Sequence, residues 1–84
     1  MSNVIFVRKS KDKNDVLSTV LFLQKKGYKG VTYNQDPVDT DVYRILIVSD
    51  DNDDLELSLK ELQKDGYEYA YIAPKKEFNF LFIK

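Results

Sequence analysis

The residues best suited to chemistry form one acidic cluster in the middle of the chain. Asp50, Asp51, Asn52, Asp53 and Asp54 are consecutive, and oxygen-rich clusters of this kind can bind Ca²⁺ or Mg²⁺. The cluster lacks the glycine and the terminal glutamate that a calcium-binding loop carries at fixed spacing. The same acids can instead cap the start of a helix, where their oxygens accept hydrogen bonds from free N–H groups. The sequence therefore predicts helix capping, with no metal and no cofactor.

Other catalytic chemistry has few residues to use. The chain has no histidine and no cysteine, which removes the commonest general base, the commonest metal ligand and every thiolate mechanism. A catalytic pair of carboxylates needs one member with a raised pKa in a dry cleft, whereas the acidic cluster is expected to be solvent-exposed. The three glycines are scattered singly and form no phosphate-binding loop. We therefore expect a protein that is not an enzyme.

Length and composition indicate the class of protein. Eighty-four residues are enough for one domain and too few for two, so one domain is expected over residues 1–84. No apolar run reaches the ~20 residues that a membrane-spanning helix needs, and the start of the chain lacks the apolar core of a signal peptide. These features predict a cytoplasmic protein with no membrane partner.

Charge is distributed unevenly along the chain. Residues 1–34 carry seven Lys or Arg against two Asp, and residues 35–84 carry six against twelve Asp or Glu. Two ordinarily solvated faces explain this pattern. A dipolar molecule that offers an acidic face to a basic partner is the alternative.

The sequence contains an internal repeat. Leu23–Tyr28 recurs thirty-nine residues later as Leu62–Tyr67, and an apolar run lies upstream of each copy, at Val4–Val7 and at Ile45–Val48. Self-similarity at a fixed period is typical of a duplicated structural unit. The repeat therefore predicts that residues 3–34 and 42–73 fold alike, each as strand, helix, strand.

Two helices are predicted from apolar residues at helical spacing. Polar residues before each helix can cap it, and Gly27 and Gly66 can adopt the left-handed conformation that ends a helix. Leu17 and Leu21 are expected to widen the first apolar stripe. The two stripes consist of Val16, Val20 and Leu23, then Leu55, Leu59 and Leu62.

Four strands flank these helices, because short β-branched and aromatic runs are typical of strands. Linking the halves gives β-α-β-β-α-β, the α+β ferredoxin-like arrangement with two helices on one face of an antiparallel sheet. A turn at 74–77 is expected to lead into an extra C-terminal β-strand, the second half of a hairpin, at 77–84. The four earlier strands are predicted at 4–8, 28–34, 42–48 and 67–73.

The uncovered face of this sheet is expected to be aromatic. Ala70 and Ile72 in the fourth strand, and Leu81 and Ile83 in the last strand, fit against the helices, so the alternating tyrosines and phenylalanines should lie on the open side. Exposed apolar patches of this kind mark interaction sites. The predicted partner-binding residues are aromatic on the sheet and acidic at its rim: Tyr67, Tyr69, Tyr71, Phe78, Phe80, Asp50, Asp51, Asp53 and Asp54.

The sequence favours a small free-standing regulatory protein that binds another protein through these surfaces. Small accessory proteins of this type, including many that bacteriophages make to modulate host machinery, often consist of one such domain. A symmetric homodimer through the aromatic face is one expected outcome. The alternative is that the terminal hairpin folds back and buries that face internally.

Single-stranded nucleic acid is the rival partner. Exposed aromatic side chains on a four-stranded sheet can stack bases, with basic residues near the phosphates. The third strand lacks the basic-glycine-aromatic signature of RNA-recognition domains, and the acidic half of the chain repels phosphate. The basic residues placed for this role are Arg8, Lys9, Lys11 and Lys13.

The paired halves resemble the SPOR domain, a peptidoglycan-binding module of about this length with two helix-strand repeats in a ferredoxin-like arrangement. The similar pieces are Leu23–Tyr28, Tyr43–Ile45 at the start of the third strand, and Leu62–Tyr67. The chain differs from the family pattern at Arg8–Ser10, where the family has a Gln and a small-residue turn, and it has no glycine after Val48. The resemblance implies the fold and, as an alternative function, peptidoglycan binding.

Overall fold

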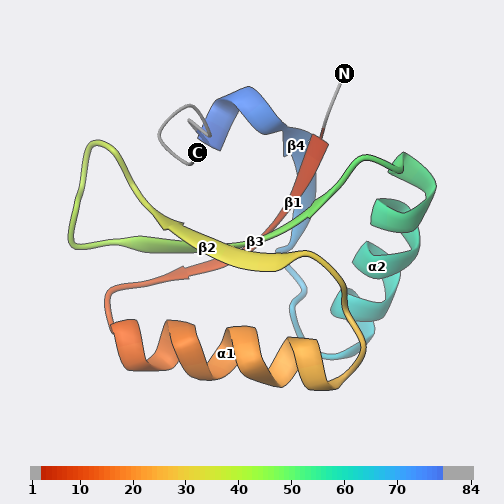
Figure 1. Ribbon diagram of the computed structural model, residues 1–84, viewed down its shortest axis with the longest axis horizontal. Helices are drawn as coiled ribbons and strands as arrows, with labels where there is room; N and C mark the ends of the chain where they lie inside the picture. Colours follow the sequence, from red (N-terminus) through yellow and green to blue (C-terminus); the bar gives the residue numbers. More distant parts are fainter. Residues whose placement is uncertain (1–2, 79–84) are drawn as a thin grey trace.

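The computed structural model describes residues 3–78, which contain four strands, two helices and a short 3-10 helix. Strands and helices follow one another as β-α-β-β-α-β before the last element (Figure 1). The bounds are β1 Asn3–Ser10, α1 Lys13–Lys25, β2 Val31–Gln35, β3 Tyr43–Ser49, α2 Asn52–Lys64, β4 Tyr71–Pro74 and η1 Lys75–Phe78.

The four strands form one antiparallel sheet in the order β2-β3-β1-β4. Helix α1 contacts β1, β2 and β3, helix α2 contacts β1, β3 and β4, and both helices share one core cluster with the sheet. Both therefore cover the same sheet face, with α1 along the bottom of Figure 1 and α2 at its right. The predicted α+β class is confirmed. Neither helix in the described residues is long and apolar enough to cross a lipid bilayer.

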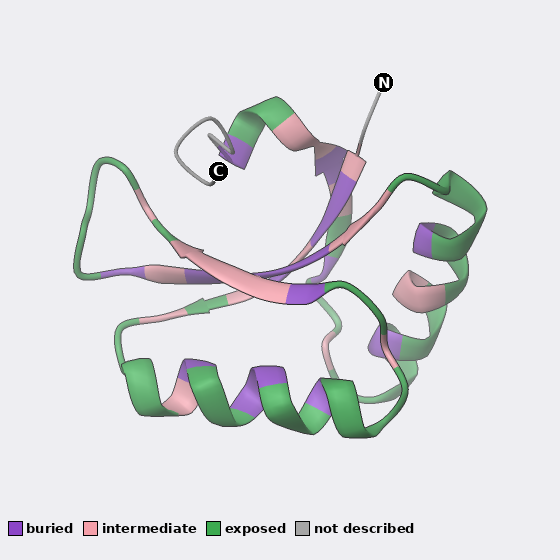
Figure 2. Ribbon diagram, viewed as in Figure 1, coloured by how far each residue is buried: buried purple, intermediate pink, exposed green. Residues whose placement is uncertain are grey.

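The core between the helices and the sheet is built from the predicted helical stripes. Val16 and Leu23 of α1 and Leu55 and Leu62 of α2 are at most 1% exposed. They pack against branched side chains of the sheet, including Ile47. In Figure 2 the buried positions of both helices lie on the sides that face the sheet. Apolar side chains at i, i+4 and i+7 thus fold these two segments as amphipathic helices.

The two helices begin with the same hydrogen bonds. Both span thirteen residues, thirty-nine residues apart. The side chain of Asp12 accepts from two backbone N–H groups at 2.9 and 3.4 Å, and Asp51 does so at the same two distances. Ser10 and Ser49 each accept from the N–H of the capping aspartate at 3.1 Å. The predicted capping role of the acidic cluster is confirmed for Asp51.

Strand β1 contains a β-bulge that changes which side chains reach the helices. Its register with β3 shifts between Phe6 and Arg8. As a result Val7 joins the core on the helix side, and Arg8 reaches α1 on that side as well. Pairing of β1 with β4 extends only from Asn3 to Phe6. The β4 ladder thus ends where the bulge begins, and the bulge directs a cation into the helix layer.

The fourth strand is accordingly shorter than predicted. Residues 67–70 form a turn in place of a strand, in which Ala70 donates its N–H to the carbonyl of Tyr67 at 3.2 Å. Ala70 and Ile72 still face the helices, as predicted. The expected alternation of Tyr67, Tyr69 and Tyr71 along one strand is wrong, because only Tyr71 belongs to β4.

The open sheet face carries its own small apolar cluster. Phe78 is only 6% exposed and packs there with Val4 and Leu46, and its ring stacks on that of Phe6 at 5.7 Å between centroids. The expectation that residues 77 and 78 begin a strand is wrong, because Lys75–Phe78 forms η1. The rest of the predicted terminal strand, including Phe80, Leu81 and Ile83, lies outside the described residues.

Candidate binding surface beside helix α2

The surface beside α2 is hollowed by two adjoining pockets that share Gly27, Leu57 and Ser58. We call them together the α2 groove. The Tyr28 pocket, of about 270 Å³, is lined by Lys26, Gly27, Tyr28, Leu57, Ser58, Glu61 and Asp65. The Asp54 pocket, of about 330 Å³, is lined by Gly27, Lys29, Ile47, Val48, Ser49, Asp54, Leu55, Leu57 and Ser58.

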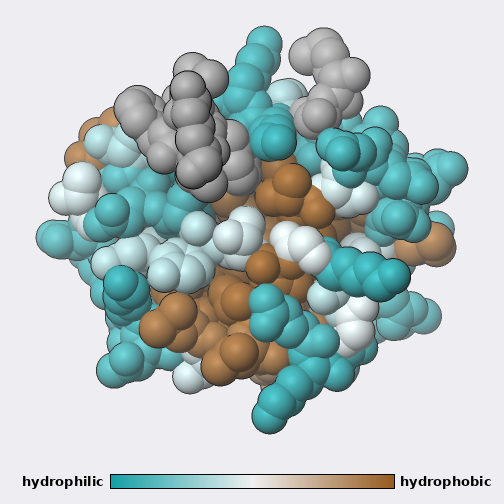
Figure 3. Space-filling model, viewed as in Figure 1, coloured by the Kyte–Doolittle hydropathy of each residue, from teal (hydrophilic) through white to brown (hydrophobic). Residues whose placement is uncertain are grey.

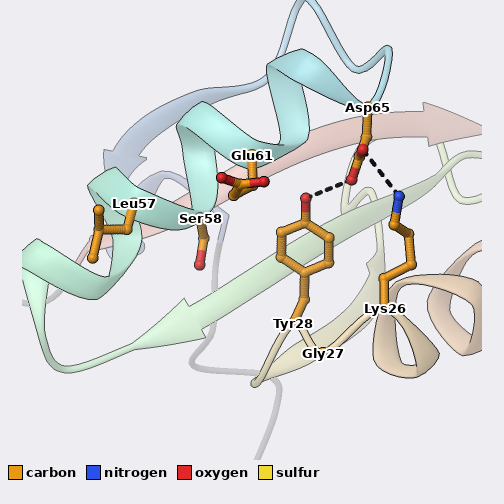
Figure 4. Close-up of a pocket in the computed structure, with 7 residues that line it drawn as sticks. All are labelled: Lys26, Gly27, Tyr28, Leu57, Ser58, Glu61 and Asp65. Atoms are coloured by element: carbon orange, nitrogen blue, oxygen red, sulfur yellow. Dashed lines mark hydrogen bonds and ion pairs between the residues drawn. The ribbon is translucent and has the colours of Figure 1, made fainter.

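The Tyr28 pocket has one end fixed by polar contacts (Figure 4). The hydroxyl of Tyr28 donates to a carboxylate oxygen of Asp65 at 2.9 Å, and Nζ of Lys26 lies 2.9 Å from the other oxygen. Lys26 and Tyr28 lower the pKa of Asp65 by hydrogen bonding to its carboxylate. Burial and the neighbouring carboxylate raise the pKa of Tyr28. This end of the groove is therefore preorganised.

Leu57 stands at the junction of the two pockets with a solvent-exposed side chain. It is 63% exposed and projects from α2 at the opposite end of the Tyr28 pocket from Asp65 (Figure 4). An apolar side chain in this position can anchor a bound molecule, because covering it removes apolar surface from water. Leu57 is not among the binding residues predicted from the sequence. The sequence does contain a signal for this residue. Leu57 lies outside the apolar stripe of Leu55, Leu59 and Leu62, on a face of the helix that is otherwise polar.

The Asp54 pocket lies where β3 meets the first turn of α2. Ile47 and Val48 come from β3, and Asp54 and Ser58 come from α2. Asp50 and Asp53 are exposed beside this turn, and the side chain of Asp51 is engaged in the cap. The four predicted acids are therefore near one another, but they differ in role. Within residues 3–78 no group of three or more potential ligand side chains is placed to hold a metal ion.

The corresponding place in the first half contains an ion pair. Arg8 donates from Nη1 and Nη2 to the two oxygens of Asp15 at 2.8 and 2.9 Å, and Nη2 also donates to Oγ1 of Thr19 at 2.7 Å. The hydrogen bonds from Arg8 lower the pKa of Asp15, with a further contribution from Ser10. This bidentate geometry is the strong form of an arginine–carboxylate contact.

Arg8→Met tests this ion pair by removing the guanidinium while keeping an apolar side chain. We expect the pKa of Asp15 to rise toward the ordinary aspartate value, because only the smaller contribution from Ser10 then remains. Because that pKa is depressed in the folded state, the ion pair stabilises the fold at a pH above the ordinary aspartate pKa. This contribution is lost as the pH falls through the folded-state pKa, and the loss should be smaller in Arg8→Met. Carboxyl NMR titration measures the pKa, with Lys9→Met as the exposed neighbouring control. An unchanged pKa in Arg8→Met would contradict the assignment.

The predicted aromatic residues do not form one patch in the described residues. Tyr67 packs against the core on the helix side, and Phe78 is buried on the open face. Tyr69 is 87% exposed in the turn before β4, and Tyr71 is 49% exposed on the open face beside Phe6. Phe80 lies outside the described residues. Of the predicted face, only Tyr71 thus lies exposed on the open side of the sheet, where its ring contacts that of Phe6, and Tyr69 is near it in sequence.

A second exposed apolar surface lies on α1. Leu17 and Leu21 were expected to widen the core stripe, but they are 39% and 59% exposed, and Phe22 is 51% exposed. Leu17 and Leu21 lie on one side of the helix and Phe22 lies about 100° around it from Leu21, all outside the arc that faces the sheet. Figure 3 shows apolar side chains across the middle of the molecule and down over the region of α1. This surface is the structural rival to the α2 groove.

Comparisons with protein families, curated proteins and solved structures gave no match to this chain. The SPOR resemblance and peptidoglycan binding therefore stay predictions.

Proposed function

We propose that this protein is a small non-enzymatic interaction or regulatory protein that binds a partner protein in the α2 groove. The observation that carries the proposal is Leu57, an apolar side chain 63% exposed at the junction of two pockets. Burying an exposed leucine is worth on the order of 2 kcal/mol. Interfaces concentrate their affinity in a few such anchors, each surrounded by a polar rim.

The partner segment that fits this surface combines an apolar side chain with a basic one. The apolar side chain covers Leu57, and the basic one meets the acids at the start of α2, where Asp50, Asp53 and Asp54 are all exposed. Charge complementarity of this kind speeds association and selects partners more than it adds affinity. Binding should therefore weaken as the salt concentration rises.

The ferredoxin-like arrangement is part of the proposal. It is supported by the element order β-α-β-β-α-β and by the strand order β2-β3-β1-β4. The matching caps of α1 and α2 support an internal repeat that extends beyond the recurring hexapeptide. In this arrangement the α2 groove lies at the junction of the two halves, because Gly27–Lys29 from the first half faces α2 of the second.

Tyr71 supports a second contact surface on the open face. Its ring lies 5.4 Å from that of Phe6, and it remains 49% exposed. A tyrosine with this exposure suits a protein contact, including one in a homodimer, and it can also stack a nucleic-acid base. The double variant Tyr69→Ala, Tyr71→Ala separates this surface from the α2 groove. A salt-sensitive mobility shift with single-stranded oligonucleotides would identify the nucleic-acid alternative.

Leu57→Ser is the variant that tests the α2 groove. We expect a purified partner, first identified by capture on the wild-type chain, to bind Leu57→Ser roughly tenfold more weakly or worse. Isothermal titration calorimetry measures the affinity. Val38→Ser is the matched control, because Val38 is 92% exposed in the β2–β3 loop, at the other end of the molecule from α2 (Figure 1).

Leu21→Ser completes the comparison by testing the rival surface on α1. If Leu21→Ser weakens binding and Leu57→Ser does not, the site lies on α1 and the groove proposal fails. If neither variant matters and the tyrosine double variant does, the open sheet face is the site. Equal binding by all of these variants would contradict every surface considered.

A further inference from the structure

We infer that the Asp54 pocket is a receptor for a guanidinium group and takes an arginine side chain of the partner. This inference rests on the proposed function and specifies the chemistry of its basic contact. The first half of the chain holds its own arginine at the equivalent place. The acidic cluster alone would indicate no receptor, since acids at a helix start are ordinary capping residues.

The two halves align residue by residue around this pocket. Asp15 and Asp54 each follow the capping aspartate by three positions, and the N–H of each donates to the cap at 3.4 Å. Thr19 and Ser58 each follow the cap by seven positions, so two residues with hydroxyl side chains occupy equivalent positions on the helices. The carboxylate and hydroxyl that hold Arg8 in the first half therefore have counterparts in the second.

The two halves differ at the strand residue that faces them. Arg8 lies two positions before Ser10 in β1, and Ile47 lies two positions before Ser49 in β3. The Ile47 side chain is 1% exposed and packs into the core, so it offers no donor to Asp54 or Ser58. In place of an internal guanidinium there is a pocket of about 330 Å³ lined by Ile47, Asp54 and Ser58.

A guanidinium suits this pocket better than an ammonium. In the first half one planar group contacts both carboxylate oxygens and the hydroxyl at 2.7 to 2.9 Å. Arginine presents its N–H donors in a fixed fork that matches this arrangement, whereas lysine presents a single point of charge. The same acceptors on α2 favour the same donor.

The charges that face a bound cation come from both walls of the pocket. Asp54 attracts it, with Asp50 and Asp53 exposed nearby, whereas Lys29 on the opposite wall repels it. Neither of the two ion pairs found in the described part of the chain involves Asp54 or Lys29. Replacing Lys29 should therefore strengthen binding of a cation and weaken binding of an anion, which makes it a discriminating variant.

The experiment is an NMR titration of the ¹⁵N-labelled protein with N-acetyl-arginine amide. We expect saturable shifts at 27–29, 47–49 and 54–58, with a dissociation constant on the order of 1 mM, as suits a single side chain. N-acetyl-citrulline amide, which has the same shape without the charge, should give no saturable shift. N-acetyl-lysine amide should bind several-fold more weakly.

Three variants decide the origin of the shifts. Asp54→Asn should weaken binding roughly tenfold, because a charge-assisted contact is lost. Asp53→Asn is the matched control from the same helical turn and should change it less than about twofold. Lys29→Ala should tighten binding roughly twofold to threefold. Retained dispersion of the NMR spectrum shows that each variant is folded.

Four results would overturn the receptor. These are no shift with the arginine compound, equal binding of the lysine compound, equal loss in Asp53→Asn and Asp54→Asn, or weaker binding in Lys29→Ala. Its failure is distinguishable from failure of the proposed function. A partner that depends on Leu57 but not on Asp54 leaves the function standing without the receptor. Saturable binding of the arginine compound, together with partner binding that does not depend on Leu57, would leave the receptor standing without the proposed function.

Discussion

Gly30→Ala is expected to lower the free energy of unfolding by about 3–4 kcal/mol, which is a large share of the stability of a chain this small. Gly30 has φ +76° and lies against β3, where a Cβ atom would overlap the backbone carbonyl of Val48. Its own carbonyl accepts from the N–H of Val48 at 3.0 Å. Because the neighbour is backbone, it cannot rotate away, and relief requires separating β2 from β3.

Gly66→Ala is the matched control for this substitution. Gly66 also has a positive φ, +105°, but a Cβ added there meets no heavy atom within 4 Å. It should therefore cost only the backbone strain of a left-handed L-residue, about 1–2 kcal/mol. Urea denaturation of the two variants gives both values. Equal losses would show that backbone conformation alone, and not contact with β3, requires glycine at position 30.

Arg44→Ala should detach η1 from the open sheet face and destabilise the chain by about 3 kcal/mol. Arg44 is 7% exposed. It donates from Nη2 to the carbonyl of Phe78 at 2.8 Å and from Nε to Oδ1 of Asn34 at 2.9 Å. Its guanidinium also lies 5.0 Å from the centroid of the Phe78 ring. Burial lowers the pKa of Arg44. The hydrogen bonds of this cation go to neutral acceptors, and one aromatic ring faces it.

Two measurements follow the detachment of η1. Urea denaturation reports the stability, and limited trypsin digestion reports the accessibility of η1, which contains Lys75 and Lys76. Cleavage there should be roughly tenfold faster in Arg44→Ala, because local opening exposes the backbone to the protease. Lys9→Ala, an exposed neighbour on the paired strand, is the control. Unchanged cleavage with lowered stability would place the role of Arg44 within the sheet instead.

The regular parts of the fold could be predicted from local patterns. Helices α1 and α2 carry complete apolar stripes and have matching caps, so their positions, caps and buried faces follow from spacing. Strands β1 and β3 are similarly evident from their β-branched runs. These patterns depend only on neighbours in the sequence, which explains why they suffice.

The errors arise where distant parts of the chain decide the outcome. The bulge before Arg8 depends on pairing with β3, and pairing of β1 with β4 ends at the same point. The alternation of residues 67–72 carries no sign of this. Tyr67 follows the C-terminal glycine of α2, where a side chain commonly turns back onto the preceding helix. Phe78 alternates with later phenylalanines, yet the contacts of Arg44 hold it in a 3-10 turn.

The candidate site was partly predictable. The acids at the start of α2 were identified as both caps and rim residues, and the structure places Asp54 beside a pocket. The pocket itself was not predictable, because it depends on Ile47 packing into the core, whereas the equivalent residue of β1, Arg8, contacts α1. That difference becomes visible only when the bulge in β1 is known.

The contact among Lys26, Tyr28 and Asp65 joins the ends of the two halves. Lys26 and Tyr28 follow the last turn of α1, and Asp65 is the residue that closes α2. Neither helix end can therefore fray without giving up a partner in the other half. The contact thus links two helix ends that have separate caps, and we expect local opening at one helix end to be accompanied by opening at the other.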